Sequence, residues 1–431
     1  MKAKRLNKKG ITLLSVLGTV LLLALYLLVR SCFGGGAKKQ PNYRIRGINT
    51  VITNEMSSGV DKLDKDIRVF MQTWWIKGLS VSVMRGDSLL WAKGYGKADE
   101  DIPMEPGKIM RIASVSKLIT AAGIMKLQEQ GKLKLSDKVF GPSGILNESV
   151  YTAAIKEKAY FDITVEQLLR HESGLSIRRG DPMFTTRDIM NIYRLKEAPD
   201  HETLVRLMLQ RRLGHKPGTS RQYNNFGYLL LSMIIEKLTG EDYEDWIREN
   251  VLEPAGCLDM HLAYTYYDQK YPNEVRYYMQ DNDPLVPEYN NSKDSVVRCY
   301  GGSDVRGLSG AGAWVASTPE LARFIASIDG QPGIKDILSI KSVRAMTIDD
   351  GNHKYGLGWN DIGDTWIRTG SLAGTNAIVY RFPDGECWIL VSNTHNWKGP
   401  RFSTRVKQFV RQCKERYSAS LPKQNLFELE Y

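Results

Sequence analysis

Strand-like segments lie near the two ends of this 431-residue chain, and helical patterns fill the region between them. The segments are short, rich in apolar residues and bounded by turn residues, as β-strands are. They cover residues 79–84, 88–94, 365–369, 376–382 and 387–392. Strands must pair with one another, so the sequence predicts one sheet built from both ends of the chain, with a helical region inserted between them.

Apolar residues at helical spacing predict the helices that accompany this sheet. A first helix is expected at residues 60–74 and a last one at residues 402–413. Further helices are expected between them, at residues 165–170, 203–213, 226–238, 243–251 and 317–330. A cleft between a sheet and an inserted helical region is where ligand sites usually lie.

An uncharged run at residues 11–29 is long enough to cross a membrane. As a helix it would rise roughly 28 Å, close to the bilayer core of about 30 Å. Five cations precede the run and only Arg30 follows closely, which favours a cytoplasmic N-terminus and export of everything that follows. The sequence therefore predicts a basic cytoplasmic tail at 1–10, a transmembrane signal anchor at 11–30 and a linker at 31–55.

Two other fates of this segment stay open. A cleaved signal peptide normally has a shorter apolar region that ends in small residues, whereas residues 29–31 are Val-Arg-Ser. Cys32 would alternatively be lipidated, although Arg30 fits poorly into the small-residue box of a lipoprotein signal. The anchor and the lipoprotein both predict a membrane-attached protein whose main domain lies outside the cytoplasm, in the periplasm or the extracellular space.

Charge and cysteine patterns argue against nucleic-acid and metal partners. Of the net charge of +11, eight positive charges lie in residues 1–39, so the remainder is nearly balanced and has no basic run interleaved with aromatics. The later cysteines show neither C-x-x-C nor zinc-ligand spacing. They could form disulfides after export, but dispersed cysteines in a large core are more often buried apolar residues. They are Cys257, Cys299, Cys387 and Cys413.

Ser114 and Lys117 form the pattern that points most directly to chemistry. They precede an apolar helix that Gly131 ends, and a spacing of three places both side chains on one helical face. A buried lysine has a lowered pKa and can act as a base toward a neighbouring hydroxyl. The backbone N–H groups at a helix N-terminus can in addition stabilise an oxyanion.

The S-x-x-K pattern is weak by itself, because Ser420 and Lys423 repeat it in the C-terminal tail at 418–431. That copy contains Pro422 and precedes no predicted helix. The context therefore favours Ser114 as the nucleophile.

Three tyrosines stand two residues before an asparagine. Tyr223 and Asn225 follow a Pro-Gly-Thr turn and precede the predicted helix at 226–238. The other two pairs lie in the polar stretch 267–294, and we interpret them as surface-loop residues. They are Tyr271 with Asn273 and Tyr289 with Asn291.

Together these motifs resemble those of the serine β-lactamase and penicillin-binding protein superfamily, in particular its class C β-lactamase-related branch of serine hydrolases. Ser114 and Lys117 match the family's nucleophile motif, and Tyr223 and Asn225 match its second motif. The surrounding sequence is similar over about residues 56–415. The further matching segments are residues 91–96, 167–175, 217–219, 252–256 and 355–359.

The resemblance implies a β-lactamase-like fold of α/β plus all-α type for a domain at 56–417, with an antiparallel sheet flanked by the first and last helices. It also implies a serine hydrolase that needs no cofactor and acts through an acyl-enzyme on a small-molecule or peptidoglycan-derived substrate. By this resemblance Ser114 attacks a carbonyl, Lys117 and Tyr223 transfer its proton, and Asn225 binds the substrate amide or Lys117.

The third motif departs from the family pattern. The family usually has lysine or histidine where this chain has Arg368, followed by Thr369, Gly370 and Ser371. Arginine keeps the positive charge but cannot give up a proton, and its planar fork suits a carboxylate. The resemblance implies that Arg368 and Thr369 hold a substrate carboxylate, and that the N–H groups of Ser114 and Ser371 form an oxyanion hole.

Other sites that the sequence could encode have less support. The G-x-S-x-G motif of Ser-His-Asp hydrolases is absent, and His171 stands in a helix cap and turn. The glycine-rich residues 301–312 lack the lysine of a phosphate loop. The Trp74-Trp75 pair is expected in packing or in a cleft wall. The alternative function is a non-catalytic or slowly acylated sensor that binds penicillin or peptidoglycan, a hypothesis supported by Arg368.

Overall fold

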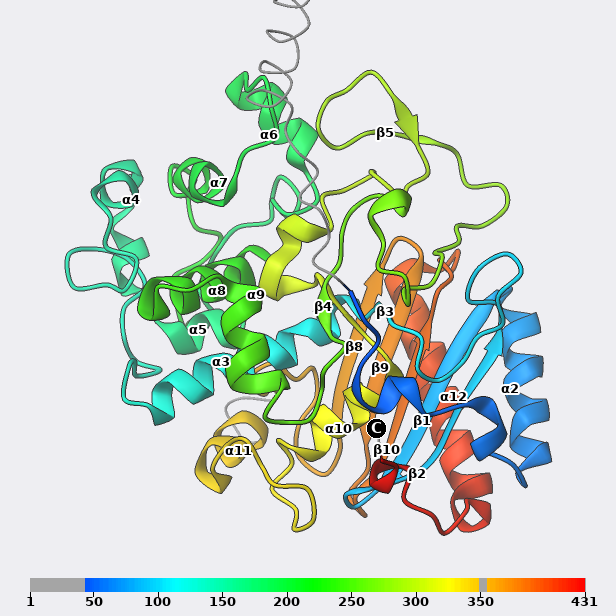
Figure 1. Ribbon diagram of the computed structural model, residues 1–431. Helices are drawn as coiled ribbons and strands as arrows, with labels where there is room; N and C mark the ends of the chain where they lie inside the picture. Colours follow the sequence, from blue (N-terminus) through cyan, green and yellow to red (C-terminus); the bar gives the residue numbers. More distant parts are fainter. Residues whose placement is uncertain (1–42, 349–354, 431) are drawn as a thin grey trace, which may run out of the picture. The chain divides into compact units, whose positions relative to one another are not determined.

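The strands predicted at the two chain ends form one antiparallel sheet in the computed structural model, which describes residues 43–348 and 355–430. Its strand order is β2-β1-β10-β9-β8, so β1 lies between its hairpin partner β2 and the C-terminal strand β10 (Figure 1). The strands are β1 (Gly78–Arg85), β2 (Ser88–Gly96), β8 (Trp366–Leu372), β9 (Thr375–Arg381) and β10 (Glu386–Ser392). The expectation of a two-ended sheet is confirmed.

The first and last predicted helices cover one face of this sheet. They are α2 (Asp61–Thr73) and α12 (Phe402–Tyr417), which lie side by side on the right in Figure 1. Leu79, Val81 and Val83 of β1 belong to the apolar cluster on this face. Alternation along a strand sends Ser80 and Ser82 to the opposite face.

The opposite face of the sheet packs against α10 (Thr318–Ala326). Ser80 Oγ lies 2.8 Å from Thr318 Oγ1, and Ser82 Oγ donates to the same oxygen at 2.9 Å. Buried hydroxyls need hydrogen-bond partners, and Thr318 provides them. Serines can therefore alternate with apolar residues in β1, although this strand is buried on both faces.

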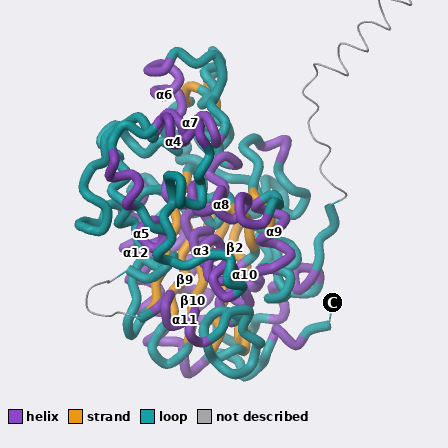
Figure 2. The backbone as a smooth tube through the Cα atoms, turned by 90° about the vertical axis from the view of Figure 1, so that its left-hand side faces the viewer, coloured by secondary structure: helices purple, strands orange, loops and turns teal. Residues whose placement is uncertain are grey.

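The inserted helical region lies on the same side of the sheet as α10. Figure 2 shows its helices in front of the strands. Its longest members are α3 (Ser116–Glu129) and α8 (Phe226–Thr239), which contact each other and are buried over most of their length. The others are α4 (Ser149–Ala154), α5 (Val165–Leu169), α6 (Thr186–Tyr193), α7 (His201–Met208), α9 (Tyr243–Ile247) and α11 (Ile340–Thr347). Small sheets of β3 (Met110–Arg111), β7 (Trp314–Ala316) and β4 (His261–Leu262), and of β5 (Val286–Pro287) and β6 (Ser295–Val296), complete this part.

The folded unit reaches further than the predicted range of 56–417 at both ends. Ile48 and Ile52, placed in the linker by the sequence analysis, are 0% and 3% exposed. Leu426 and Phe427 of the predicted tail are also buried in the core. These few apolar residues stand in polar surroundings, so periodicity does not reveal that they pack against the core.

The predicted signal anchor and Cys32 lie outside the described residues. Within residues 43–348 and 355–430, no helix combines the length and the apolar character needed to span a bilayer. Cys257, Cys299, Cys387 and Cys413 are buried as free thiols.

Candidate active site

The structure brings Ser114 and Lys117 together where β8 meets the start of α3. Ser114 lies on a short 3₁₀ turn (Ala113–Val115) that leads directly into α3, whose second residue is Lys117. Lys117 Nζ is 3.2 Å from Ser114 Oγ. The expected pairing is therefore present, although the serine stands just before the α-helix.

Tyr223 and Asn225 reach the same two side chains from the loop before α8. Tyr223 OH lies 2.7 Å from Ser114 Oγ, and Asn225 Oδ1 accepts a hydrogen bond from Lys117 Nζ at 2.7 Å. Ser114 Oγ thus lies within hydrogen-bonding distance of both an amine and a phenol. A serine hydroxyl with two such neighbours can lose and regain its proton locally.

The competing pair Tyr271 and Asn273 plays a different part from the one expected. Both residues are buried, at 5% and 3% exposure, and Asn273 Nδ2 donates to Gly107 O and Asp259 Oδ2. The interpretation of this pair as surface-loop residues was wrong, because a polar stretch of sequence also contains residues that fasten a loop to the core.

The surroundings of the Lys117 amine disfavour its protonated, charged form. Its side chain is fully buried, and this loss of hydration lowers its pKa well below the ordinary 10.5. The nearby Arg368 cation lowers the pKa further, whereas the Asp181 carboxylate raises it. Lys117 is therefore suited to accept a proton.

Asp181 is a site residue that the sequence analysis missed. Its Oδ2 accepts hydrogen bonds from the backbone N–H of Asn225 at 3.0 Å and from Asn225 Nδ2 at 2.9 Å. Because the amide nitrogen is taken by Asp181, the amide oxygen of Asn225 faces Lys117. No motif links a loop aspartate with an asparagine far along the chain.

The glycine-rich segment supplies a second unexpected contact. Ala311, at the end of a turn (Arg306–Ala311), accepts a hydrogen bond from Lys117 Nζ through its carbonyl oxygen. A Cβ on Gly310 would lie 2.7 Å from Thr120 Oγ1 of α3. The glycines in this segment therefore let a loop backbone approach the helix that carries Lys117. The high glycine content of residues 301–312 is the sequence feature that could have indicated this close approach.

Arg368 contacts both the nucleophile's backbone and Tyr223. The residue is 1% exposed, its Nε donates to Ser114 O at 2.7 Å and its Nη2 donates to Tyr223 OH at 3.2 Å. Nη1 is buried and has no hydrogen-bond partner among the described residues. The contacts of Nε and Nη2 give Arg368 a positioning role toward the nucleophile's backbone and the phenol, and its binding of a substrate carboxylate stays a prediction.

The edge of β8 that does not pair with β9 carries backbone N–H groups directed away from the sheet. The N–H groups of Ile367 and Thr369 point away from β9, since they donate to Asp361 O and to Asn360 Oδ1. Alternation along the strand gives the N–H of Ser371 the same direction. The strand can approach Ser114 closely because residue 370 is glycine, where a Cβ would lie 2.9 Å from Ser114 N. The oxyanion hole expected from the N–H groups of Ser114 and Ser371 stays a prediction, which this direction of the Ser371 N–H favours.

His171 forms part of the wall behind Tyr223. It is buried, its ring packs 4.4 Å from the Tyr223 ring, and its Nδ1 accepts a hydrogen bond from Asn224 N. Burial lowers the pKa of His171 well below its usual value, and the nearby Lys117 and Arg368 side chains lower it further. In the described part of the chain, no group of three or more His, Cys, Asp or Glu side chains could hold a metal ion.

Sequence comparison finds known relatives of this chain. Protein flp of Staphylococcus aureus (strain COL) is 28% identical over 247 residues, which cover 56% of this chain and 45% of the relative. The chain thus spans about half the length of the curated relatives that it matches first.

Two solved structures share the fold. The D-amino acid amidase from Ochrobactrum anthropi SV3 aligns with a TM-score of 0.62 and 22% identity, covering 83% of this chain and 99% of the amidase. FmtA from Staphylococcus aureus aligns with a TM-score of 0.61 and 19% identity, covering 90% and 95%. The model of the Beta-lactamase family matches residues 63–409, which include every element of the site described above, and the chain accordingly belongs to this family.

Proposed function

We propose that the protein is a serine hydrolase in which Ser114 forms an acyl-enzyme with an amide or ester substrate. The observation that carries the proposal is the position of Ser114 Oγ, 3.2 Å from Lys117 Nζ and 2.7 Å from Tyr223 OH. An unassisted serine is a poor nucleophile at neutral pH, and both neighbours can take up its proton.

Hydrogen bonding suggests how Lys117 acts. A neutral amine has two N–H groups and one lone pair, and Asn225 Oδ1 and Ala311 O are the acceptors nearest to its nitrogen. If those two oxygens take the two N–H groups, the lone pair is left for the Ser114 hydroxyl. Lys117 then removes the proton as Ser114 Oγ bonds to the carbonyl carbon.

The remaining steps follow from the same groups. The N–H groups of Ser114 and Ser371 stabilise the negative oxygen of the tetrahedral intermediate. When the bond to the leaving nitrogen or oxygen breaks, Tyr223 or Lys117 returns the proton to that atom. Water then attacks the carbonyl carbon of the acyl-enzyme and gives up a proton to Lys117 or Tyr223. That proton returns to Ser114 Oγ as the ester bond breaks, which releases the acid and free Ser114.

The substrate classes we propose are β-lactams, D-alanyl peptides and simple esters. One structural neighbour is named as a D-amino acid amidase and another as a penicillin-binding protein homologue, which supports a carbonyl substrate of this kind. Incubation with a fluorescent penicillin and with a chromogenic ester tests the proposal. Covalent labelling or turnover is expected, whereas ligand binding without either would support the non-catalytic sensor.

Replacement of Arg368 should affect charged and neutral substrates alike. The guanidinium holds Ser114 O and Tyr223 OH, so Arg368→Ala removes positioning that every substrate needs. Loss of a charge-assisted hydrogen bond, roughly 1.5–3 kcal/mol, corresponds to a fall in kcat/KM of about 10–150-fold. Parallel kinetics on a neutral ester and a carboxylate-bearing amide check this, and a loss confined to the carboxylate substrate would support the substrate-binding role.

Removing the charges of Asp181 and Arg368 should shift the pH profile in opposite directions. The neutral form of Lys117 is the active one, so kcat/KM rises with pH through the pKa of this amine. Asp181 raises that pKa and Arg368 lowers it. We therefore expect the acidic limb to move to lower pH in Asp181→Asn and to higher pH in Arg368→Ala. Glu253→Gln, which removes an exposed carboxylate paired with Arg248, is the matched control. Equal shifts in both site variants would exclude Lys117 as the titrating base.

We also propose that residues 11–29 anchor this hydrolase with its catalytic domain outside the cytoplasm. The full-length protein should stay with membranes after a high-salt wash. Deletion of residues 1–40 should release a soluble, active domain, because the core begins near Ile48. Sedimentation and ester hydrolysis by both forms check this. Native protein in the soluble fraction, with its N-terminus beyond Cys32, would contradict the anchor.

A further inference from the structure

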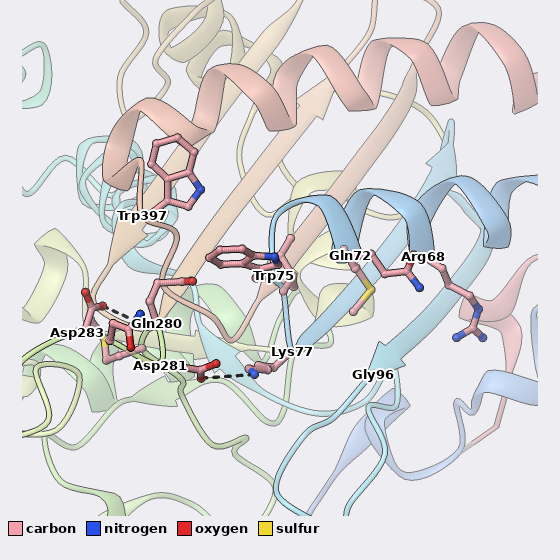
Figure 3. A pocket seen from close by; sticks show the side chains of 13 residues that line it. Arg68, Gln72, Trp75, Lys77, Gly96, Gln280, Asp281, Asp283 and Trp397 are labelled. Atoms are coloured by element: carbon pink, nitrogen blue, oxygen red, sulfur yellow. Dashed lines mark hydrogen bonds and ion pairs between the residues drawn. The ribbon is translucent and has the colours of Figure 1, made fainter.

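A cavity lies at the end of the sheet where β1 begins, lined by different residues from those of the candidate active site. It has a volume of about 840 Å³, within the range of about 300–1,000 Å³ that is usual for small-molecule sites. The end of α2, the start of β1, the loop at 279–283 and Trp397 line it (Figure 3). Ser114, Lys117, Tyr223 and Arg368 take no part in it. We call this cavity the tryptophan groove.

Two exposed indole rings distinguish the groove from the rest of the described surface. Trp75 is 68% exposed and Trp397 is 62% exposed, and Figure 3 shows both rings beside the cavity, above Gln280 and Asp281. The Trp397 ring stacks on Trp74 with centroids 6.3 Å apart, and Lys398 Nζ lies 4.8 Å from its centroid. Neighbours thus hold the Trp397 ring in place while most of its surface faces water.

The backbone of Trp75 shows that the fold alone does not explain this tryptophan. It stands just after the C-cap of α2 with a φ of 54°, a left-handed position that glycine normally occupies. A bulky residue is strained in this conformation, and an exposed indole gains little from burial. Strain of this kind is typically retained where a side chain has a binding role.

The polar residues of the groove indicate what kind of ligand it takes. Among the lining residues Arg68 and Lys77 balance Asp281 and Asp283, and Lys398 adds one positive charge beside the Trp397 ring. Nucleic acids and anionic membrane surfaces require an excess of lysine and arginine, which the lining of this groove lacks. Gln72, Gln280 and Asn282 add amide groups that can donate and accept at once.

We propose that the tryptophan groove binds a short oligosaccharide of uncharged hexose or N-acetylhexosamine units. Such a sugar has an apolar C–H face, which suits the flat indoles of Trp75 and Trp397, and a rim of hydroxyls, which suits the amides and carboxylates around them. This binding site is separate from the hydrolase function proposed above and does not depend on Ser114.

Calorimetric titration of the full-length protein with chitohexaose and with cellohexaose tests the proposal. Saturable binding of at least one of them is expected. Trp75→Gly and Trp397→Ala should each weaken it at least about tenfold, as removal of an aromatic anchor does. Trp75→Gly should melt no lower than the parent protein, because glycine relaxes the left-handed backbone. Ile192→Ala, which trims a residue of α6 that is 49% exposed, and Ser114→Ala should bind the sugar as the parent does.

Four results would overturn the proposal. The first is that neither sugar binds the parent protein, and the second is that both tryptophan variants bind with unchanged affinity. The third is a clearly lowered melting temperature of Trp75→Gly, which would make Trp75 a structural residue. The fourth is tryptophan-dependent binding of a protein lacking residues 1–40 to phosphatidylglycerol vesicles with no sugar binding, which would identify the groove as a membrane contact.

Discussion

Ser114→Ala should abolish both turnover and covalent labelling by a slow acylating substrate. The variant keeps Lys117, Tyr223 and the backbone donors, but it has no atom at Oγ to bond to the carbonyl carbon. Any remaining hydrolysis must then use water, and the loss should approach the whole acceleration provided by the covalent route. Intact-mass spectrometry followed by peptide mapping checks the result, because the adduct on the parent protein should lie on the peptide that contains Ser114.

The chain offers a matched control for this variant. Ser420 belongs to the second S-x-x-K sequence, but Ser420 and Lys423 are both exposed, and the tail there packs through Leu421. No buried amine stands beside the Ser420 hydroxyl, so Ser420→Ala should change neither labelling nor turnover. An adduct on any peptide without Ser114 would refute the proposed mechanism.

Lys117→Ala and Tyr223→Phe should each lower kcat/KM by about 100 to 10,000-fold, the range typical of general acid–base residues. Each variant removes one of the two groups within hydrogen-bonding distance of Ser114 Oγ. The acidic limb of the pH profile, which reports the titration of Lys117, should disappear in Lys117→Ala and persist in Tyr223→Phe. Steady-state kinetics across the pH range check both expectations.

The double variant separates a joint mechanism from two independent ones. Lys117 and Tyr223 act on the same proton, so the pair of substitutions should cost little more than the worse single one. Multiplied losses would mean that the two residues contribute to different steps. Asn225→Ala gives a further comparison, because it removes a neighbour of Lys117 without touching Ser114 Oγ.

The sheet and the residues Ser114, Lys117, Tyr223 and Asn225 could be predicted because local sequence patterns indicate them. The five strands and the helices beside them show regular apolar spacing, and the contexts of Ser114 and Tyr223 separated them from their competitors. The site is less predictable where it depends on contacts between distant loops. Asp181 and Ala311 contact the site through a carboxylate and a main-chain carbonyl, and neither carries a motif of its own.

Arg368 shows a second limit of sequence reasoning. The residue type correctly implied a permanent cation next to the nucleophile, but it did not tell which atoms the cation would contact. That depended on β8 passing so close to Ser114 that Nε reaches the serine carbonyl. The resemblance pointed to a substrate carboxylate, whereas the packing gave the guanidinium two partners within the protein.

The pairing of β1 with β10 also determines at which stage of its synthesis the chain can complete the site. Leu79 pairs with Ser392, and Arg368 and the outward N–H of Ser371 belong to a strand near the end of the chain. Long-range pairings of this kind form slowly, because a large loop must close before any contact is gained. A ribosome that has finished the nucleophile helix has made β1 and β2 but not β8, β9 and β10, so the sheet is incomplete and the cation of Arg368 is still missing. We therefore expect a product that stops before residue 366 to carry Ser114 without hydrolytic activity.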